Sequence, residues 1–144
     1  MTAYLGLGTN LGVDKAANLH QAVTLLGEQA GNVLACSSFI ETEPWGFQSE
    51  NTFLNAVVAI ETSYSPHALL RITQAIERHM GRTHKTKDGD YKDRIIDIDI
   101  LLYGKEVIHD SDLIIPHPLI MQREFVYRPL FEIAPEIEQL LHTI

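Results

Sequence analysis

Apolar positions along the chain recur with two periods, one typical of strands and one typical of helices. Short apolar runs rich in β-branched and aromatic side chains predict four strands, at residues 2–8, 32–42, 52–62 and 95–103. Two longer segments with apolar side chains three and four positions apart predict amphipathic helices, at residues 15–29 and 66–80. Ser65 before Pro66 is a strong helix start, because serine caps a helix and proline suits its first position. Gly81 is suited to end the same helix.

The order of these elements is strand, helix, strand, strand, helix, strand. This order predicts an α+β fold with a ferredoxin-like βαββαβ sheet and helices packed on it. The segment from Val107 onward carries several prolines, and we expect it to form a C-terminal extension with one or two short helices against the core. Because no linker, repeat or low-complexity stretch interrupts the pattern, residues 1–144 are predicted to form a single domain.

Asp97 and Asp99 stand out inside the most apolar of these runs, DRIIDIDILLYG at residues 93–104. Alternation along a strand predicts that both carboxylates lie on one face, about 6.6 Å apart at their Cα atoms. That face also carries Ile95, Leu101 and Tyr103, and the opposite face is wholly aliphatic, with Ile96, Ile98, Ile100 and Leu102. Two like charges this close either point into solvent or are neutralised by a divalent cation such as Mg²⁺. This stretch alone favours neither interpretation.

The composition excludes several classes of protein. With 45% hydrophobic and 21% charged residues, the chain is typical of a globular domain. The net charge of −8 argues against a general nucleic-acid binder, and no apolar run approaches the roughly 20 residues that span a bilayer. Cys36 is the single cysteine, so an internal disulfide is excluded, and we expect its side chain in the core. The N-terminus lacks the pattern of a secretory signal, so we expect a cytoplasmic monomer without membrane or nucleic-acid partners.

Positive charge is concentrated in one segment of this acidic chain. Six of the eleven lysine and arginine residues fall between residues 78 and 94: Arg78, Arg82, Lys85, Lys87, Lys92 and Arg94. Such a run is usually a solvated loop, but it also suits a small polyanion such as a triphosphate. Because the run leads directly into the aspartate pair, we favour the second interpretation, in which residues 82–94 close over the bound anion.

Other polar residues are weaker candidates. Gln74 and Glu77 share one stripe of the second helix, which is either solvated or turned towards the basic segment. His117 lies between two prolines and is followed by Arg123, and both a structural role and a phosphate contact stay open for the histidine. The stretch GLGTNLG has the spacing GxGxxxG, which matches a dinucleotide-binding loop only weakly, and Gly8 is more simply a turn residue.

Several aromatic residues fall outside the predicted helices and strands, among them Trp45, Phe47 and Phe125. Packing in the core is the simplest explanation for each of them. If they gather beside a cleft instead, they suit stacking on a flat heterocycle.

Taken together, these motifs resemble the 6-hydroxymethyl-7,8-dihydropterin pyrophosphokinase family. The resemblance extends from about Tyr4 to Pro135 and includes, in the family's order, GTNLG, TEPWG, FLNA, QAIERHMGR, DRIIDIDILLYG and PHPLIMQREFVYRPLFEIAP. It implies a ferredoxin-like α+β fold and a reaction of folate biosynthesis, in which ATP and the hydroxymethyl-dihydropterin give AMP and the pterin pyrophosphate. The sequence departs from the family pattern at His84, where an arginine is common, and has no tryptophan shortly before Arg94.

The resemblance also implies roles for individual residues. Asp97 and Asp99 would bind two Mg²⁺ ions on the triphosphate, as two-metal phosphoryl transfer requires, and Arg82 and Arg94 would act with them in catalysis. The nucleotide and its phosphates would contact Gln74, Glu77, Arg82, Arg94, Ile100, His117 and Arg123. The pterin would occupy a slot formed by Thr42, Pro44, Trp45, Phe53, Asn55 and Phe125.

A second class of function also stays open. The same fold could act as a non-enzymatic module that binds a small ligand, with the aspartates merely solvated. Ligand binding that is independent of Mg²⁺ and occurs without turnover would distinguish this module from an enzyme.

Overall fold

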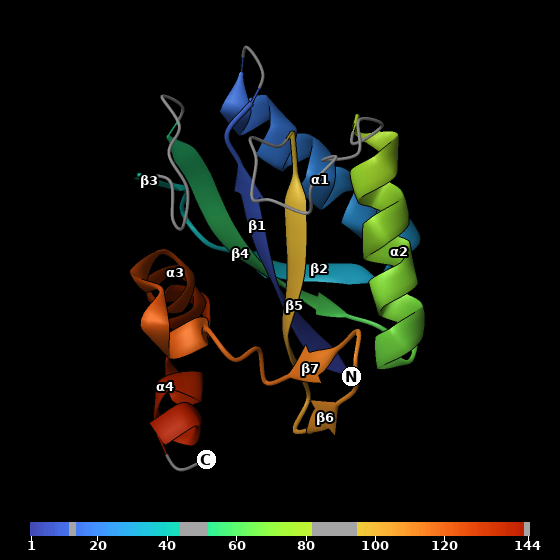
Figure 1. Cartoon of the computed structure of the whole chain (residues 1–144), viewed down its shortest axis with the longest axis vertical. Coiled ribbons are helices and arrows are strands. Elements are labelled where there is room, and N and C mark those ends of the chain that lie inside the picture. The colour runs from blue at the N-terminus through green and yellow to red at the C-terminus, as the bar shows by residue number, and fades with distance from the viewer. Residues whose placement is uncertain (12–13, 44–51, 82–94, 143–144) are drawn as a thin grey trace.

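An antiparallel sheet forms the centre of the protein (Figure 1) in the computed structural model, which describes residues 1–11, 14–43, 52–81 and 95–142. Its strands are β1 (Thr2–Thr9), β2 (Asn32–Cys36), β3 (Ile40–Thr42), β4 (Phe53–Glu61) and β5 (Asp97–Tyr103). The strand order is β2-β4-β1-β5, and β3 pairs with the part of β4 that lies beyond β2. The first strand of the chain is therefore central, and β5 lies at an edge.

Helices cover both faces of this sheet. One face carries α1 (Lys15–Gln29) and α2 (Pro66–His79), and the other carries α3 (Glu124–Ile133) and α4 (Pro135–His142), which lie together at the lower left of Figure 1. Smaller elements are the hairpin of β6 (Ile108–His109) and β7 (Ile114–Ile115) and a 3-10 turn at Ile120–Gln122. In the described ranges no helix combines the length and the apolar character needed to cross a membrane.

The two helices predicted in the first part of the chain are confirmed. At the start of α1, the Asp14 carboxylate accepts the Ala17 N–H. At the start of α2, the Ser65 hydroxyl accepts the Ala68 N–H. Beyond the end of α2, Gly81 has a φ of +114°, which glycine adopts readily and which stops the helix from continuing.

Alternation along the strands divides the apolar residues between two clusters. The cluster under α1 and α2 includes Leu5, Leu19, Leu26, Ile60, Leu69, Ile76 and Ile98. The cluster under α3 and α4 includes Val57, Leu101, Leu102, Ile120 and Leu130. Where both faces of the sheet are covered, the sequence is continuously apolar, at residues 56–60 of β4 and 100–103 of β5.

β5 departs from simple alternation at Leu101. The residues on either side of it, Ile100 and Leu102, lie opposite consecutive residues of β1, so Leu101 is an insertion in the pairing. Such a β-bulge reverses the faces of the residues beyond it. Leu102 therefore packs under α3 and α4, and Tyr103 packs under α1 and α2. The predicted faces are right from Ile96 to Leu101 and wrong for Leu102 and Tyr103. They are also wrong for Ile95, which precedes β5 and packs against the cluster under α1 and α2.

Three other features of the fold differ from the sequence-based prediction. The strand expected at residues 32–42 is two strands, because the Ser37 hydroxyl accepts the Val57 N–H between them in place of a backbone carbonyl. Cys36 is exposed rather than in the core, since it lies on the edge strand β2. The hairpin of β6 and β7 was not predicted, because strands of two residues have no detectable period.

That residues 1–144 form a single domain stays a prediction, which Leu130 on α3 allows us to test. Its side chain is 0% exposed, so Leu130→Ala should lower the free energy of unfolding of the whole chain by about 2–5 kcal/mol. Leu34→Ala on β2 is the control and should change it by less than about 1 kcal/mol, because Leu34 is 56% exposed. Urea unfolding followed by circular dichroism measures both variants. An unchanged main transition in Leu130→Ala would contradict a single cooperative unit.

Candidate functional site

Three residues from neighbouring strands form a row across the sheet. Gly8 of β1 lies opposite Asn55 of β4 on one side and opposite Asp97 of β5 on the other. Neighbouring strands are separated by about 4.8 Å, so the backbones at Asn55 and Asp97 are about 10 Å apart. The row therefore places a residue expected to contact the pterin and a residue expected to bind metal on opposite sides of one strand.

Gly8 contributes no side chain to the middle of this row, and the side chains of Asn55 and Phe53 lie next to it. A Cβ atom at Gly8 would lie 3.2 Å from Asn55 Oδ1 and 3.6 Å from a ring carbon of Phe53. One row further along β1, the Leu101 side chain lies over Gly6, because a Cβ atom there would be 3.4 Å from it. Gly8 thus lies inside a strand and not in a turn, which corrects the sequence-based interpretation. We refer to the position without a side chain at Gly8, between Asn55 and Asp97, as the gap.

Asp97 and Asp99 lie on the face of β5 turned away from α1 and α2. Ile98 belongs to the cluster under those helices, so alternation directs the two carboxylates to the opposite face, as predicted. Both aspartates are partly buried. Carboxylates are the oxygen ligands that Mg²⁺ prefers, and partial exposure leaves space for the water and phosphate oxygens that complete its shell. The donor set fits Mg²⁺.

Asn55 is held in place by β3. Its side chain is 5% exposed, and its Nδ2 donates to the Ile40 carbonyl oxygen at 3.2 Å and to Thr42 Oγ1 at 2.9 Å. Because these bonds use the amide hydrogens, the Oδ1 atom is the group that lies next to Gly8. A hydrogen-bond acceptor at this place suits a ligand edge that carries N–H donors.

A pocket of about 410 Å³ lies beside β3 and the start of α3. It brings together Thr42 and Phe125, expected in the pterin slot, and Arg123, expected at the phosphates. The Arg123 guanidinium lies 5.8 Å from the centre of the Phe125 ring, within cation–π range. The remaining lining residues are Ile40, Glu41, Gln122, Glu124 and Arg128. The combination of an aromatic ring and polar groups suits a flat heterocyclic ligand.

His117 is fixed by the backbone around it. Its N–H donates to the Leu101 carbonyl oxygen at 2.9 Å, and its ring Nδ1 accepts the Leu119 N–H at 3.2 Å. Burial, followed by the positive charge of Arg123, lowers the pKa of His117 below its ordinary value, while Asp97 opposes this shift. His117 is therefore neutral near pH 7 and carries its proton on Nε2, where it can donate a hydrogen bond to a phosphate oxygen.

The remaining residues expected at the nucleotide differ in burial and in the groups that they can offer to a ligand. Glu77 is buried, and its Oε2 accepts the Ile98 N–H at 2.7 Å, whereas Gln74 is exposed on the same helix. The Ile100 side chain lies in the cluster under α1 and α2, so only its backbone on the outer edge of β5 is available to a ligand. Pro44, Trp45, Arg82 and Arg94 lie outside the described residues, as do His84 and the expected closure of residues 82–94.

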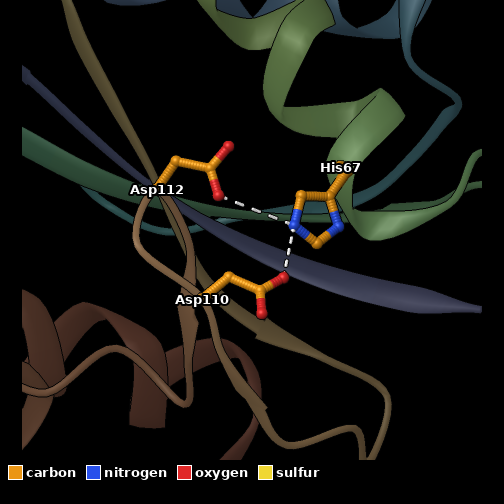
Figure 2. Close-up of side chains that lie close together, drawn as sticks. All are labelled: His67, Asp110 and Asp112. Carbon is orange, nitrogen blue, oxygen red and sulfur yellow. Dashed lines mark ion pairs between the residues drawn. The ribbon is translucent and has the colours of Figure 1, made fainter.

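A group of possible metal ligands that the sequence analysis missed lies elsewhere on the protein (Figure 2). His67 Nε2 lies 2.8 Å from Asp110 Oδ2 and 3.7 Å from Asp112 Oδ1, and one donor atom from each residue lies within 4.8 Å of the other two. The signal in the sequence was the DSD stretch at residues 110–112. All three side chains are more than one-third exposed, and an ion pair with protonated His67 accounts for the arrangement without a metal ion.

Comparison with protein families decides the relationship of this chain. The model of the family described as 7,8-dihydro-6-hydroxymethylpterin-pyrophosphokinase (HPPK) matches residues 4–135. The chain belongs to the HPPK family. A relative from Porphyromonas gingivalis, named 2-amino-4-hydroxy-6-hydroxymethyldihydropteridine pyrophosphokinase, is 50% identical over 92% of this chain and 90% of its own. A relative of the same name from Bacillus subtilis is 44% identical over 95% of this chain and 80% of its own.

Solved structures of HPPK-DHPS proteins share the fold. One, described as HPPK-DHPS in complex with substrates, covers 94% of this chain with a TM-score of 0.73 and 19% identity. A Plasmodium falciparum HPPK-DHPS also covers 94% of it, with a TM-score of 0.66 and 18% identity. The chain spans 40% of each of these longer proteins. At such low identity, these similarities concern the fold alone.

Gly8→Ala tests the gap in the row. The added Cβ would push against Asn55 Oδ1, so we expect the KM for the pterin to rise about 10-fold, the cost of roughly one hydrogen bond. Steady-state kinetics with each substrate varied in turn measures the effect. Gly27→Ala is the matched control, because a Cβ there would make only ordinary contact with Val33, and it should leave KM unchanged. An unchanged pterin KM in Gly8→Ala would show that the gap does not accommodate substrate.

The pKa of His117 provides a test of the electrostatics. In protein freed of metal ions, Arg123→Gln should raise this pKa, because it removes a positive charge that lowers it. Asp97→Asn should lower the pKa further, because it removes a negative charge that raises it. Nuclear magnetic resonance (NMR) titration of the histidine rings measures it, and His117→Asn identifies the signal. Since the unfolded chain binds this proton more readily, the contribution of His117 to stability is full above about pH 6.5 and is lost as the pH falls through the folded pKa. A single pKa shared by wild type and both variants would contradict the proximity of the three groups.

Proposed function

We propose that this chain catalyses the reaction for which its relatives are named, with the row of Asn55, Gly8 and Asp97 as its centre. Pyrophosphate passes from ATP to 6-hydroxymethyl-7,8-dihydropterin, giving AMP and the pterin pyrophosphate, a step of folate biosynthesis. The pterin oxygen attacks the β-phosphorus, and the bond from that phosphorus to the oxygen bridging to the α-phosphorus breaks. The observation that supports this best is the pairing of Gly8 with both Asn55 and Asp97, because it brings the residue expected at the pterin to within about 10 Å of a residue expected at the metal.

The pterin binds on the side of the row that carries Asn55. Its flat ring fits the pocket beside β3, stacked on Phe125, and Thr42 and Phe53 border it. Asn55 Oδ1 accepts from the N–H donors on the pterin edge, since its Nδ2 is held by Ile40 and Thr42. Pro44 and Trp45 are proposed for the same slot from the sequence alone.

The triphosphate binds on the side of the row that carries the aspartates. Asp97 and Asp99 would hold Mg²⁺, with two ions expected when ATP is bound, and the bound Mg²⁺ would supply positive charge to offset that of the phosphates. His117 donates a hydrogen bond from Nε2, and Arg123 supplies a positive charge between the pocket and the phosphates. Arg82 and Arg94 are proposed catalytic residues on the sequence motif. Gln74 and the backbone of Ile100 complete the nucleotide site.

The strand order β2-β4-β1-β5, with α1 and α2 on one face, supports a ferredoxin-like assignment of the sheet and an extension formed by α3 and α4. A cytoplasmic monomer without nucleic-acid or membrane partners accords with the net charge of −8 and is part of the same proposal.

Phosphorus NMR of ATP, Mg²⁺ and the hydroxymethyl-dihydropterin with the purified protein tests the proposed reaction directly. We expect AMP and a pterin pyrophosphate to appear in equal amounts and only when Mg²⁺ is present. Formation of ADP would indicate transfer of a single phosphoryl group and would overturn the proposal. Ligand binding independent of Mg²⁺ and without turnover would instead support a non-enzymatic module.

Asp97→Asn tests the metal assignment. Loss of this charge should lower kcat by about 10²-fold, while the folded protein should be no less stable in the absence of metal, because repulsion from Asp99 is relieved. Asp110→Asn is the control, since it removes a carboxylate from the exposed ion pair with His67 and should leave kcat unchanged. Full activity in Asp97→Asn would be incompatible with metal binding at the pair.

A further inference from the structure

Glu77 makes a contact that differs from the role its position in the family motif implies. Its side chain is 5% exposed, and its Oε2 accepts the Ile98 N–H at 2.7 Å. Ile98 stands between Asp97 and Asp99 in the sequence. The Glu77 carboxylate therefore binds the backbone of β5 at the residue between the two proposed metal ligands. A hydrogen bond of this length with a charged acceptor is among the stronger ones in proteins.

The contact comes from the side of β5 that has no neighbouring strand. β1 pairs with one edge of β5, and β5 is the last strand of the sheet, so no strand in the described part of the chain pairs with its outer N–H groups. α2 contacts β5, and Glu77 extends from it to the Ile98 N–H at that edge. At Ile98, between the two aspartates, the Glu77 side chain thus accepts the hydrogen bond that a neighbouring strand would otherwise accept.

On the inner edge of β5, glycines lie opposite both aspartates. Cross-strand contacts between opposed side chains normally help to fix the conformation of a strand pair. The β1 residues opposite Asp97 and Asp99 are Gly8 and Gly6, which have no side chains. On the β1 side, glycines therefore offer the two aspartates no opposed side chain. Glu77 adds a contact to the same stretch of β5 from the outer edge.

We propose that Glu77 is a positioning residue for the metal-binding pair. By holding the Ile98 N–H, it fixes the backbone between Asp97 and Asp99 and so directs both carboxylates towards one bound ion. This inference rests on the proposed function, because it takes the pair to be the metal site. It places Glu77 behind the metal ligands rather than against the nucleotide. It also gives Glu77 a different role from that of Gln74, which is exposed on the same helix.

Two conservative variants separate the contact from the charge. Glu77→Gln keeps an oxygen at the same reach but removes the charge, and Glu77→Asp keeps the charge but is one methylene too short to reach the Ile98 N–H. If Glu77 acts by position, Glu77→Asp should weaken metal binding about 10-fold, as is typical for groups that orient metal ligands. Glu77→Gln should stay within about 3-fold of wild type.

The probe is Mn²⁺ together with an ATP analogue in which a methylene group bridges the α- and β-phosphorus atoms. Electron paramagnetic resonance measures bound Mn²⁺, and the amide proton of Ile98 gives a second readout by NMR, because a short bond to an oxygen acceptor shifts it downfield. We expect this downfield shift in wild type and Glu77→Gln, and its loss in Glu77→Asp. Neither readout requires turnover.

Thr73→Ala is the matched structural control. Thr73 is buried on the same helix, and its hydroxyl donates to the Leu70 carbonyl oxygen of that helix at 2.8 Å. Its loss should lower the melting temperature without changing Mn²⁺ affinity or the Ile98 amide shift.

The outcomes are separable. Equal Mn²⁺ affinity in wild type and Glu77→Asp would overturn the inference and leave the proposed reaction intact, as would weak binding in Glu77→Gln with normal binding in Glu77→Asp. Absence of Mn²⁺ binding in wild type would overturn the metal site and this inference with it.

Discussion

The antiparallel pairing of β1 with β4 on one side and β5 on the other is the constraint on which the rest of the site depends. It places Asn55 and Asp97 in one row, although they lie far apart in the sequence. Leu5 and Leu7 of β1 face the cluster under α1 and α2, and so the intervening Gly6 and Gly8 face the opposite side. One strand therefore contributes to the core through its leucines and to the site through its glycines. A shift of one residue in its register would exchange these two roles and remove both.

The site also concentrates interactions that oppose folding. Asp97 and Asp99 bring two negative charges to one face, and Glu77 places a further carboxylate in a buried position behind them. Burying or pairing like charges costs free energy, which metal binding or hydrogen bonding must offset. Glu77 offsets part of its own cost through the Ile98 N–H, whereas the aspartates are expected to gain most when a cation binds. If the pair binds metal as proposed, the protein has lower stability without ligand in exchange for a preorganised metal site.

Local patterns in the sequence were sufficient for the helices α1 and α2 and for the long strands. They were insufficient for the division at Ser37, for the hairpin of β6 and β7, and for the exact pairing of the strands. The caps at Asp14 and Ser65 act within a few residues, so the helix that starts at Ser65 could be placed from the sequence. The bulge at Leu101 depends on how β5 meets β1, and no residue within β5 signals it. Likewise, Gly8 resembled a turn residue because its neighbours across the sheet are invisible to a local pattern. Glu77 lay on a polar stripe whose direction only the packing of α2 against β5 determines.

The edge position of β5 connects these features. A central strand has both edges bonded to neighbouring strands, so its backbone cannot contact a ligand, whereas no described strand pairs with the outer edge of β5, where we propose the nucleotide contact at Ile100. An open edge is also a place where strands move or associate with other chains. The Glu77 contact at Ile98 restrains that edge two residues before Ile100, and the bulge at Leu101 follows directly after it. The accessible backbone is thus limited to a short stretch between two fixed points, beside the carboxylates that the phosphates of a nucleotide would approach.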